Sequence, residues 1–193
     1  MTAVLVVYAS RHGGTQGIAE RIGQVLRTDG IQAEVQPADQ VAGVGNADAV
    51  IIGSGVYMGS WLHEATDFLR RNVNGLAERP LWLFSSGPLP GSSKEDPAAE
   101  EPIAAALGPE TGPGSGGRKK IAELSAATHP VDHRVFLGAF DPDDPPKVLA
   151  ERLVRLLPGS RNILPSGDFR EWDAIEAWAH EIAATLRGAP VEA

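Results

Sequence analysis

The amino-acid sequence predicts a doubly wound α/β protein, in which a five-stranded parallel sheet carries helices on both faces. Two observations lead to this prediction. Short apolar runs of strand length alternate with longer segments whose apolar residues recur every three or four positions. Glycine- and serine-rich stretches also follow three of the apolar runs directly, and such stretches occur in this class of fold where the chain leaves a strand.

The first half of the chain contains three expected strands and two expected helices. Residues 4–9 are continuously apolar, as in a strand that is buried on both faces. Between Ile18 and Leu26 the apolar residues recur with helical spacing. The expected strands cover residues 4–9, 31–35 and 47–54, and the expected helices cover residues 15–27 and 61–72.

The second half is interrupted by a segment rich in Gly, Pro and acidic residues. We interpret this segment, residues 91–117, as a mobile loop. Asp168 stands three residues before Glu171, which is the spacing of a capping box at the start of a last helix. The expected strands cover residues 80–85 and 133–140, and the expected helices cover residues 118–128, 147–157 and 171–187. The length is that of one domain, which we expect to span residues 1–193.

Composition and charge exclude several classes of function. The chain has 17 Lys and Arg against 25 Asp and Glu, a net charge of −8, so it lacks the basic surface that nucleic-acid binding needs. It has no Cys, which excludes disulfides and thiolate metal sites. His129 and His133 are four residues apart, but Pro130 prevents the continuous helix that would place them on one face, so we expect no metal site. No apolar run is long enough to span a membrane, and we expect a soluble, cytoplasmic protein.

Five strands with helices on both faces suggest the strand order 2-1-3-4-5. Ligands of such sheets bind at the carboxyl ends of the strands, where the order reverses between the first and third strands. Three segments of the sequence therefore form the candidate site: 10–15, 54–59 and 85–89.

The segment SRHGGT, Ser10 to Thr15, has the character of an anion site. Its glycines allow a close approach of the backbone, and the helix that follows directs its positive end toward the segment. Ser10 and Thr15 add hydroxyl donors, and His12 adds an imidazole donor. The segment lacks the Gly-Lys-Ser/Thr of a P-loop and suits a single phosphate. The alternative is a strand-to-helix turn that Ser or Thr caps.

The other two segments suit a flat ligand. In the second, glycines allow a backbone approach and Tyr57 could stack on an aromatic ring, whereas Trp61 fits better as a core residue. The third, beginning at Ser85, offers backbone amides and hydroxyls but no aromatic residue, and alone it could be an ordinary loop.

These motifs resemble the flavodoxin-like family, and more closely its flavodoxin-type, quinone-dependent protoporphyrinogen oxidase subfamily. The resemblance rests on VVYASRHGGTQGIAERI, VIIGSGVYMGSWLHEATDFL, FLGAF and DFREWDAIEAWAHEIA. It spans most of the chain but not the region from about Gly91 to Asp132. The family's phosphate loop usually reads Ser/Thr-x-Thr-Gly-x-Thr, and His12 stands here where Thr is usual.

The resemblance implies a flavodoxin-like fold with FMN as cofactor. It implies that the flavin performs the redox chemistry and that the protein positions it. On this resemblance Ser10, Arg11, His12, Gly13, Gly14 and Thr15 would hold the phosphate; Ser54, Gly55, Val56, Tyr57, Met58 and Gly59 would line the isoalloxazine; and Ser85, Ser86, Gly87, Pro88 and Leu89 would face its pyrimidine edge.

Three functions remain open on these grounds. The first is an FMN-dependent oxidoreductase that acts on a small-molecule redox substrate such as protoporphyrinogen or a quinone. The second is a non-enzymatic electron carrier, whose negative charge would suit a basic redox protein partner. The third is a flavin-free binding protein of the same fold. Aromatic residues at the rim could also join copies of the chain, so a homo-oligomer remains an alternative.

Overall fold

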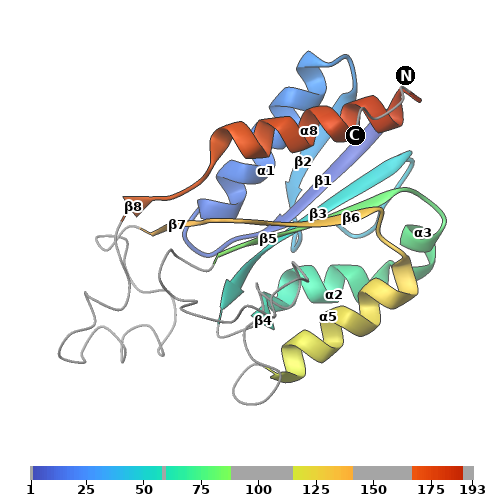
Figure 1. Cartoon of the computed structure of the whole chain (residues 1–193). Helices are drawn as coiled ribbons and strands as arrows, with labels where there is room; N and C mark the ends of the chain where they lie inside the picture. The colour runs from blue at the N-terminus through green and yellow to red at the C-terminus, as the bar shows by residue number, and fades with distance from the viewer. Residues whose placement is uncertain (1, 58–59, 88–114, 141–166, 189–193) are drawn as a thin grey trace.

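A computed structural model describes residues 2–57, 60–87, 115–140 and 167–188 of the chain (Figure 1). Its central sheet has the order β2-β1-β3-β5-β6, and all neighbours along this path are parallel. Counted along the chain, these five strands follow the predicted order 2-1-3-4-5; the short strand β4 pairs antiparallel with β3 as an addition. The bounds are β1 Ala3–Ala9, β2 Gln32–Pro37, β3 Ala49–Tyr57, β4 Ser60–Trp61, β5 Leu81–Ser86 and β6 Asp132–Phe136.

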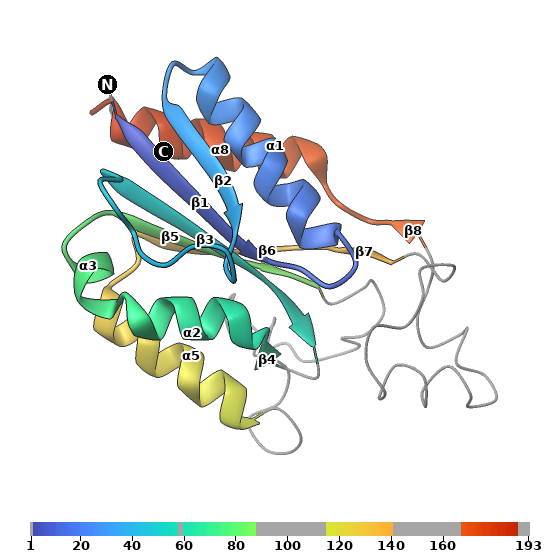
Figure 2. The same cartoon turned by 180° about the vertical axis from the view of Figure 1, so that it is seen from behind.

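Helices cover both faces of the sheet, as the sequence predicts (Figures 1 and 2). Two helices lie on one face, α1 Gly14–Thr28 and α8 Trp172–Leu186. Three lie on the other, α2 His63–Arg71, α3 Val73–Ala77 and α5 Ser115–Thr128. Within the described ranges, no helix is long and apolar enough to cross a membrane.

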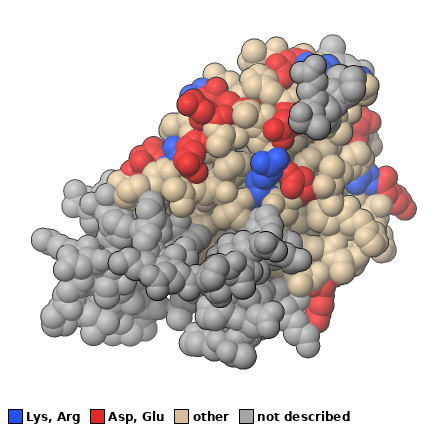
Figure 3. Space-filling model, in the orientation of Figure 1, with Lys and Arg blue, Asp and Glu red and all other residues tan. Residues whose placement is uncertain are grey.

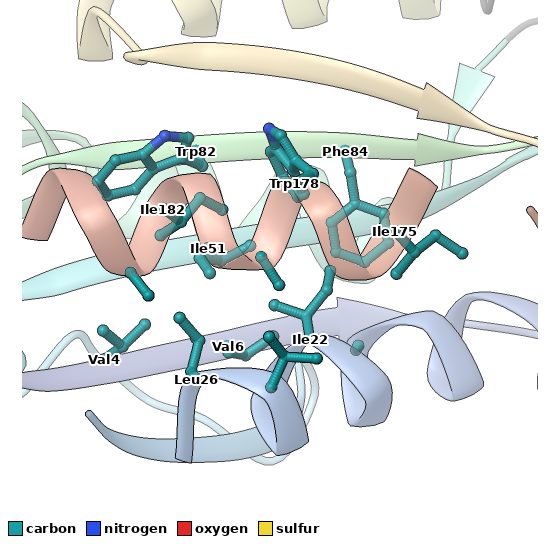
Figure 4. Close-up of a cluster of buried hydrophobic side chains, with 14 of the residues drawn as sticks. Val4, Val6, Ile22, Leu26, Ile51, Trp82, Phe84, Ile175, Trp178 and Ile182 are labelled. Atoms are coloured by element: carbon teal, nitrogen blue, oxygen red, sulfur yellow. The ribbon is translucent and has the colours of Figure 1, made fainter. Parts of the chain in front are cut away.

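The core consists of two apolar layers, one on each side of the sheet. Figure 4 shows the layer beneath α1 and α8, where Trp178 and Ile182 point from α8 toward Ile51 of β3. Trp178 is 2% exposed, and its indole N–H donates to the Asp132 carboxylate at 2.9 Å. On the opposite side, Phe68 of α2 packs with β-strand residues in a second buried cluster. Burial on both faces explains why the inner strands read as continuous apolar runs.

One expected strand, residues 133–140, is in fact two strands. β6 ends at Phe136, and β7 (Ala139–Phe140) leaves the central sheet to pair antiparallel with β8 (Gly167–Asp168). Between them the chain passes the end of β5, where the Gly87 amide donates to the Phe136 carbonyl at 3.0 Å and Gly138 lies next to Ser86. Apolar patterning alone does not reveal this change of strand partner.

Other element boundaries also differ from the predictions. The helix expected from Trp61 begins at His63, because Trp61 belongs to β4. The expected loop 91–117 overlaps α5 at residues 115–117, and its remainder, like the expected helix 147–157, lies outside the described residues.

The capping box predicted for the last helix does not form. No side chain caps α8, and the Asp168 carboxylate instead accepts hydrogen bonds from the Arg170 guanidinium at 2.6 and 2.7 Å and from the Arg170 amide at 3.1 Å. These bonds lower the pKa of Asp168, the guanidinium contributing most.

Candidate functional site

The three predicted segments begin at one edge of the sheet, because the strand register aligns their starting points. Ala9 pairs with Ser54, Ser54 pairs with Ser85, and Ser85 pairs with Val135 in one row across the sheet. This row lies at the carboxyl ends of the parallel strands, which is where open α/β sheets bind ligands.

The segment between β1 and α1 forms a turn whose helix start carries no side-chain cap. Gly13 is the residue before the helix and has a φ of +79°, a left-handed conformation that glycine adopts without strain. Neither Ser10 nor Thr15 makes a capping bond, so the alternative of a Ser- or Thr-capped turn is wrong. The first-turn amides of the 15-residue helix α1 are thus directed at this segment without a side-chain acceptor.

The first and second segments touch through Thr15 and Gly55. Thr15 is 4% exposed, and a Cβ on Gly55 would lie 3.2 Å from the Thr15 hydroxyl oxygen and 3.0 Å from the Tyr57 ring. A side chain at position 55 would therefore press on both neighbours. Gly55 itself lies in strand β3, as do Ser54, Val56 and Tyr57, so the predicted loop is a strand end that turns back as β4.

The side chains of Arg11, His12 and Tyr57 lie close together at the carboxyl edge of the sheet. The Arg11 guanidinium carbon lies 4.8 Å from the centroid of the Tyr57 ring, within the range of a cation–π contact. The His12 ring centroid lies 6.4 Å from that of Tyr57, with the planes inclined by 42°. Tyr57 is half-buried, so its ring is held against the first segment.

The hydroxyls of Ser54 and Ser85 are used inside the fold. Both residues are fully buried. The Ser54 oxygen accepts from the Leu62 amide at 3.0 Å, and its hydroxyl donates to the Gly55 carbonyl at 3.0 Å. The Ser85 oxygen accepts from the indole N–H of Trp61 at 2.8 Å, which makes Trp61 a core residue, as the sequence favours. The side chains of both serines are thus committed to other protein groups.

Ser85 also contacts a buried histidine that the sequence analysis treated only as a rejected metal ligand. Its oxygen lies 2.9 Å from His133 Nε2, and the His133 ring packs edge-on against Trp61 at 5.7 Å. Burial lowers the pKa of His133 to about 4 despite the nearby Asp132 carboxylate. A neutral histidine beside a serine can activate a nucleophile. Here Ser85 has no exposed surface, so the pair is structural.

The third segment, at the end of β5, lies against the residues that connect β6 to β7. The Gly87 amide donates to the Phe136 carbonyl at 3.0 Å, and Gly87 has a φ of +102°. Ser86 is 7% exposed, and the backbone of Gly138 passes against it. Four further predicted site residues, Met58, Gly59, Pro88 and Leu89, lie outside the described residues.

A cavity of about 250 Å³ adjoins the first segment. Ser10 and Gln16 line it together with Tyr8, Asp39 and Glu64. Burial, reinforced by the negative charges of Glu20 and Asp39, raises the pKa of Tyr8. A larger hollow of about 560 Å³ lies toward the start of β1, between β2 and residues 40–47. We assign the smaller cavity to the site because ligands of this fold bind at the carboxyl edge.

The part of the chain that the structure describes contains no cluster of side chains that could bind a metal ion. No group of three or more His, Asp or Glu side chains is arranged there to hold a metal ion.

Comparison with known proteins decides the family. The family model described as a flavodoxin domain matches residues 5–143, which is most of the chain. This chain belongs to the flavodoxin domain family. The matched region includes all three candidate site segments. It shows the family and does not reach the protoporphyrinogen oxidase subfamily. A comparison with curated proteins gave no match.

Solved flavodoxins share the fold at low sequence identity. A flavodoxin from the domain Archaea superposes with a TM-score of 0.55 at 17% identity, over 96% of this chain and 99% of that one. A flavodoxin of Streptococcus pneumonia TIGR4 gives 0.54 at 18% identity, over 95% and 99%. The rubredoxin oxygen:oxidoreductase of Desulfovibrio gigas also gives 0.54, at 15% identity, over 96% of this chain but 36% of that one. These likenesses confirm the predicted flavodoxin fold.

Proposed function

We propose that this protein binds FMN at the carboxyl edge of its sheet and acts in electron transfer. The observation that carries the proposal is the meeting, at the switch point between β1 and β3, of an uncapped helix start with Gly55 and Tyr57. An uncapped helix start favours a phosphate, and a glycine beside an aromatic ring favours a flat heterocycle. A flavin mononucleotide contains both a phosphate and a flat heterocycle. The match to the flavodoxin domain family also supports FMN as the ligand.

The residues present fit such a group. The backbone amides from Gly13 to Thr15 would bind the phosphate, helped by the Thr15 hydroxyl, which lies at the same edge. Tyr57 would stack on the ring system, and the backbone of the third segment from Ser85 would face its pyrimidine edge. Because the hydroxyls of Ser54 and Ser85 are engaged elsewhere, we assign these two residues a supporting role through their backbone and their internal bonds.

The bound flavin would supply the redox chemistry. The protein's own residues would orient it and set its electrostatic surroundings. Arg11 brings a positive charge next to Tyr57, at the place proposed for the ring system. A fixed cation near a flavin favours the more negatively charged, reduced cofactor and so raises its reduction potential.

We propose the electron carrier as the first of two functions. The chain's net charge of −8 suits docking to a basic redox protein. On the face that bears α1 and α8, acidic and basic side chains are interspersed (Figure 3). Ion pairs such as Arg21–Glu176 at 3.2 Å and Arg134–Glu181 at 3.2 Å join them there.

A small-molecule oxidoreductase is the second candidate. One feature of the sequence favours it: the third segment, SSGPL, contains no aromatic residue to cover the flavin. An uncovered flavin face would admit a planar substrate, and the sequence motifs around SRHGGT and VYMGSW resemble the protoporphyrinogen oxidase subfamily. A quinone would be the corresponding electron acceptor.

Absorbance and turnover separate these functions. We expect the purified protein to be yellow, or to become so on addition of FMN, with saturation at one FMN per chain. A chain that stays colourless with added FMN would refute the proposal and favour the flavin-free alternative. Tyr57→Ala should shift the flavin spectrum or potential, whereas Tyr57→Phe, which keeps the aromatic ring, serves as the control and should leave both close to those of the wild type.

With FMN bound, a second assay distinguishes the two candidates. Steady consumption of protoporphyrinogen or a reduced quinone analogue would identify an enzyme. Reduction by a partner reductase without small-molecule turnover would identify a carrier. The cytoplasmic location, the single-domain span and a homo-oligomeric state stay predictions.

A further inference from the structure

Two serines near the carboxyl ends of β3 and β5, Ser54 and Ser85, bind the segment that returns as β4. Ser54 and Ser85 are neighbours in the sheet register, so their side chains lie on the same face. They bind consecutive residues of the return, since Ser85 accepts from the Trp61 indole at 2.8 Å and Ser54 accepts from the Leu62 amide at 3.0 Å. All four residues are at most 5% exposed.

His133 extends this arrangement to a third strand. It lies on β6 and contacts the Ser85 oxygen at 2.9 Å, while its ring packs edge-on against Trp61. Its ring is neutral at neutral pH, so Nε2 can accept the Ser85 hydroxyl proton while the Ser85 oxygen accepts the Trp61 indole proton. The hydroxyl is then both donor and acceptor, and β4, β5 and β6 are joined through one oxygen atom.

We propose that Ser54, Ser85, Trp61, Leu62 and His133 form a clamp that positions the cofactor segments. The antiparallel pair of β3 and β4 includes Tyr57, the proposed stacking residue, and the end of β5 carries the proposed pyrimidine-facing amides. The side-chain bonds of the clamp fix these two segments relative to each other, and the two serine side chains do not reach the ligand. Its members are positioning residues, and the proposal rests on the proposed binding of FMN.

The geometry explains why these positions are polar within an otherwise apolar layer. Ser85 follows the apolar residues Leu83 and Phe84 in a strand whose six residues are all buried, and a hydroxyl there would be unfavourable without partners. Its two bonds compensate for the burial. An apolar residue at this position would fill the space but would leave the Trp61 N–H unpaired and the hairpin without its attachment.

FMN titration of two variants that break the same bond tests the clamp. Ser85→Ala removes the acceptor, and Trp61→Phe removes the donor but keeps an aromatic ring. Each should raise the Kd for FMN about tenfold, the effect of losing one buried hydrogen bond. Because the two changes break one bond, the double variant should bind about as weakly as the weaker single variant.

Thr128→Ala is the matched control. Thr128 is 2% exposed and its hydroxyl donates to the Leu124 carbonyl at 2.9 Å, but it lies at the end of α5 that precedes β6, away from the carboxyl edge. This variant also loses a buried hydroxyl bond, yet its Kd should stay within about twofold of the wild type. If the wild type binds FMN and both clamp variants bind it equally well, the clamp proposal is wrong.

A second readout separates this failure from failure of the proposed function. If the wild type does not bind FMN, the proposed function fails. Backbone hydrogen exchange over residues 55–62 then tests the clamp in the protein alone. Faster exchange there in Ser85→Ala than in Thr128→Ala supports the clamp, and equal exchange overturns it.

Discussion

Acid should destabilise this protein partly through His133. Burial lowers the pKa of this histidine from 6.5 to about 4 in the folded protein. Between these two values the unfolded chain binds more protons than the folded one, so stability falls as the pH falls through this window. A pKa difference of about 2.5 corresponds to about 3 kcal/mol of unfolding free energy. This contribution is complete above about pH 6.5 and is lost by about pH 4.

Urea unfolding followed by tryptophan fluorescence measures this effect. We would compare the wild type with His133→Gln, whose amide oxygen can still accept the Ser85 hydroxyl proton but whose side chain does not titrate. Acid titrates many carboxylates as well, but these cancel in the difference between the two proteins. The stability advantage of the wild type should shrink by about 3 kcal/mol between about pH 7.5 and about pH 4.

His63→Gln serves as the control for the loss of a histidine. The His63 side chain is 76% exposed on α2, so its removal should leave the unfolding free energy at neutral pH nearly unchanged. Parallel stability curves for the wild type and His133→Gln would refute the reasoning, because they would mean that His133 titrates alike in the folded and unfolded chains.

Three further substitutions test the close contacts of the fold. Thr15→Ala should weaken FMN binding by about 1–3 kcal/mol in a fluorescence titration; unchanged affinity would mean that Thr15 serves only the packing against Gly55. Gly53→Ala should lower the unfolding free energy by about 1–3 kcal/mol, since its Cβ would overlap the buried Phe84 ring. Gly17→Ala should also lower it, by about 1 kcal/mol or more, because its Cβ would displace the Arg170 guanidinium, which the Asp168 carboxylate holds by two hydrogen bonds, and the gain in helix propensity of about 1 kcal/mol offsets only part of this cost. No loss from Gly17→Ala would show that Arg170 moves aside at little cost.

The sequence was sufficient for the strand order and for placing the three candidate segments at one edge of the sheet. Both follow from periodicity, because doubly buried strands are continuously apolar and helices bury one stripe. Burial also explains why Trp61 was assigned to the core, as the structure confirms.

Long-range pairing explains what the sequence could not predict. The break between Phe136 and Ala139 depends on the pairing of β7 with β8, and the role of Ser85 depends on Trp61 and on His133, 48 residues away. A polar residue inside an apolar strand was the available signal for both Ser85 and His133. Without knowledge of its partners, such a residue cannot be distinguished from one that faces a ligand.

The position of α8 has a consequence for folding during synthesis. The α2 side of the sheet can be covered once α5, which ends at Thr128, has been made, but Trp178 and Ile182 of α8 are synthesised about 50 residues later. Among the described helices, only α1 can cover the opposite side before then, which leaves apolar surface around Phe84 without its α8 partners. The nascent chain is therefore more open to chaperones and to aggregation before α8 emerges than after it.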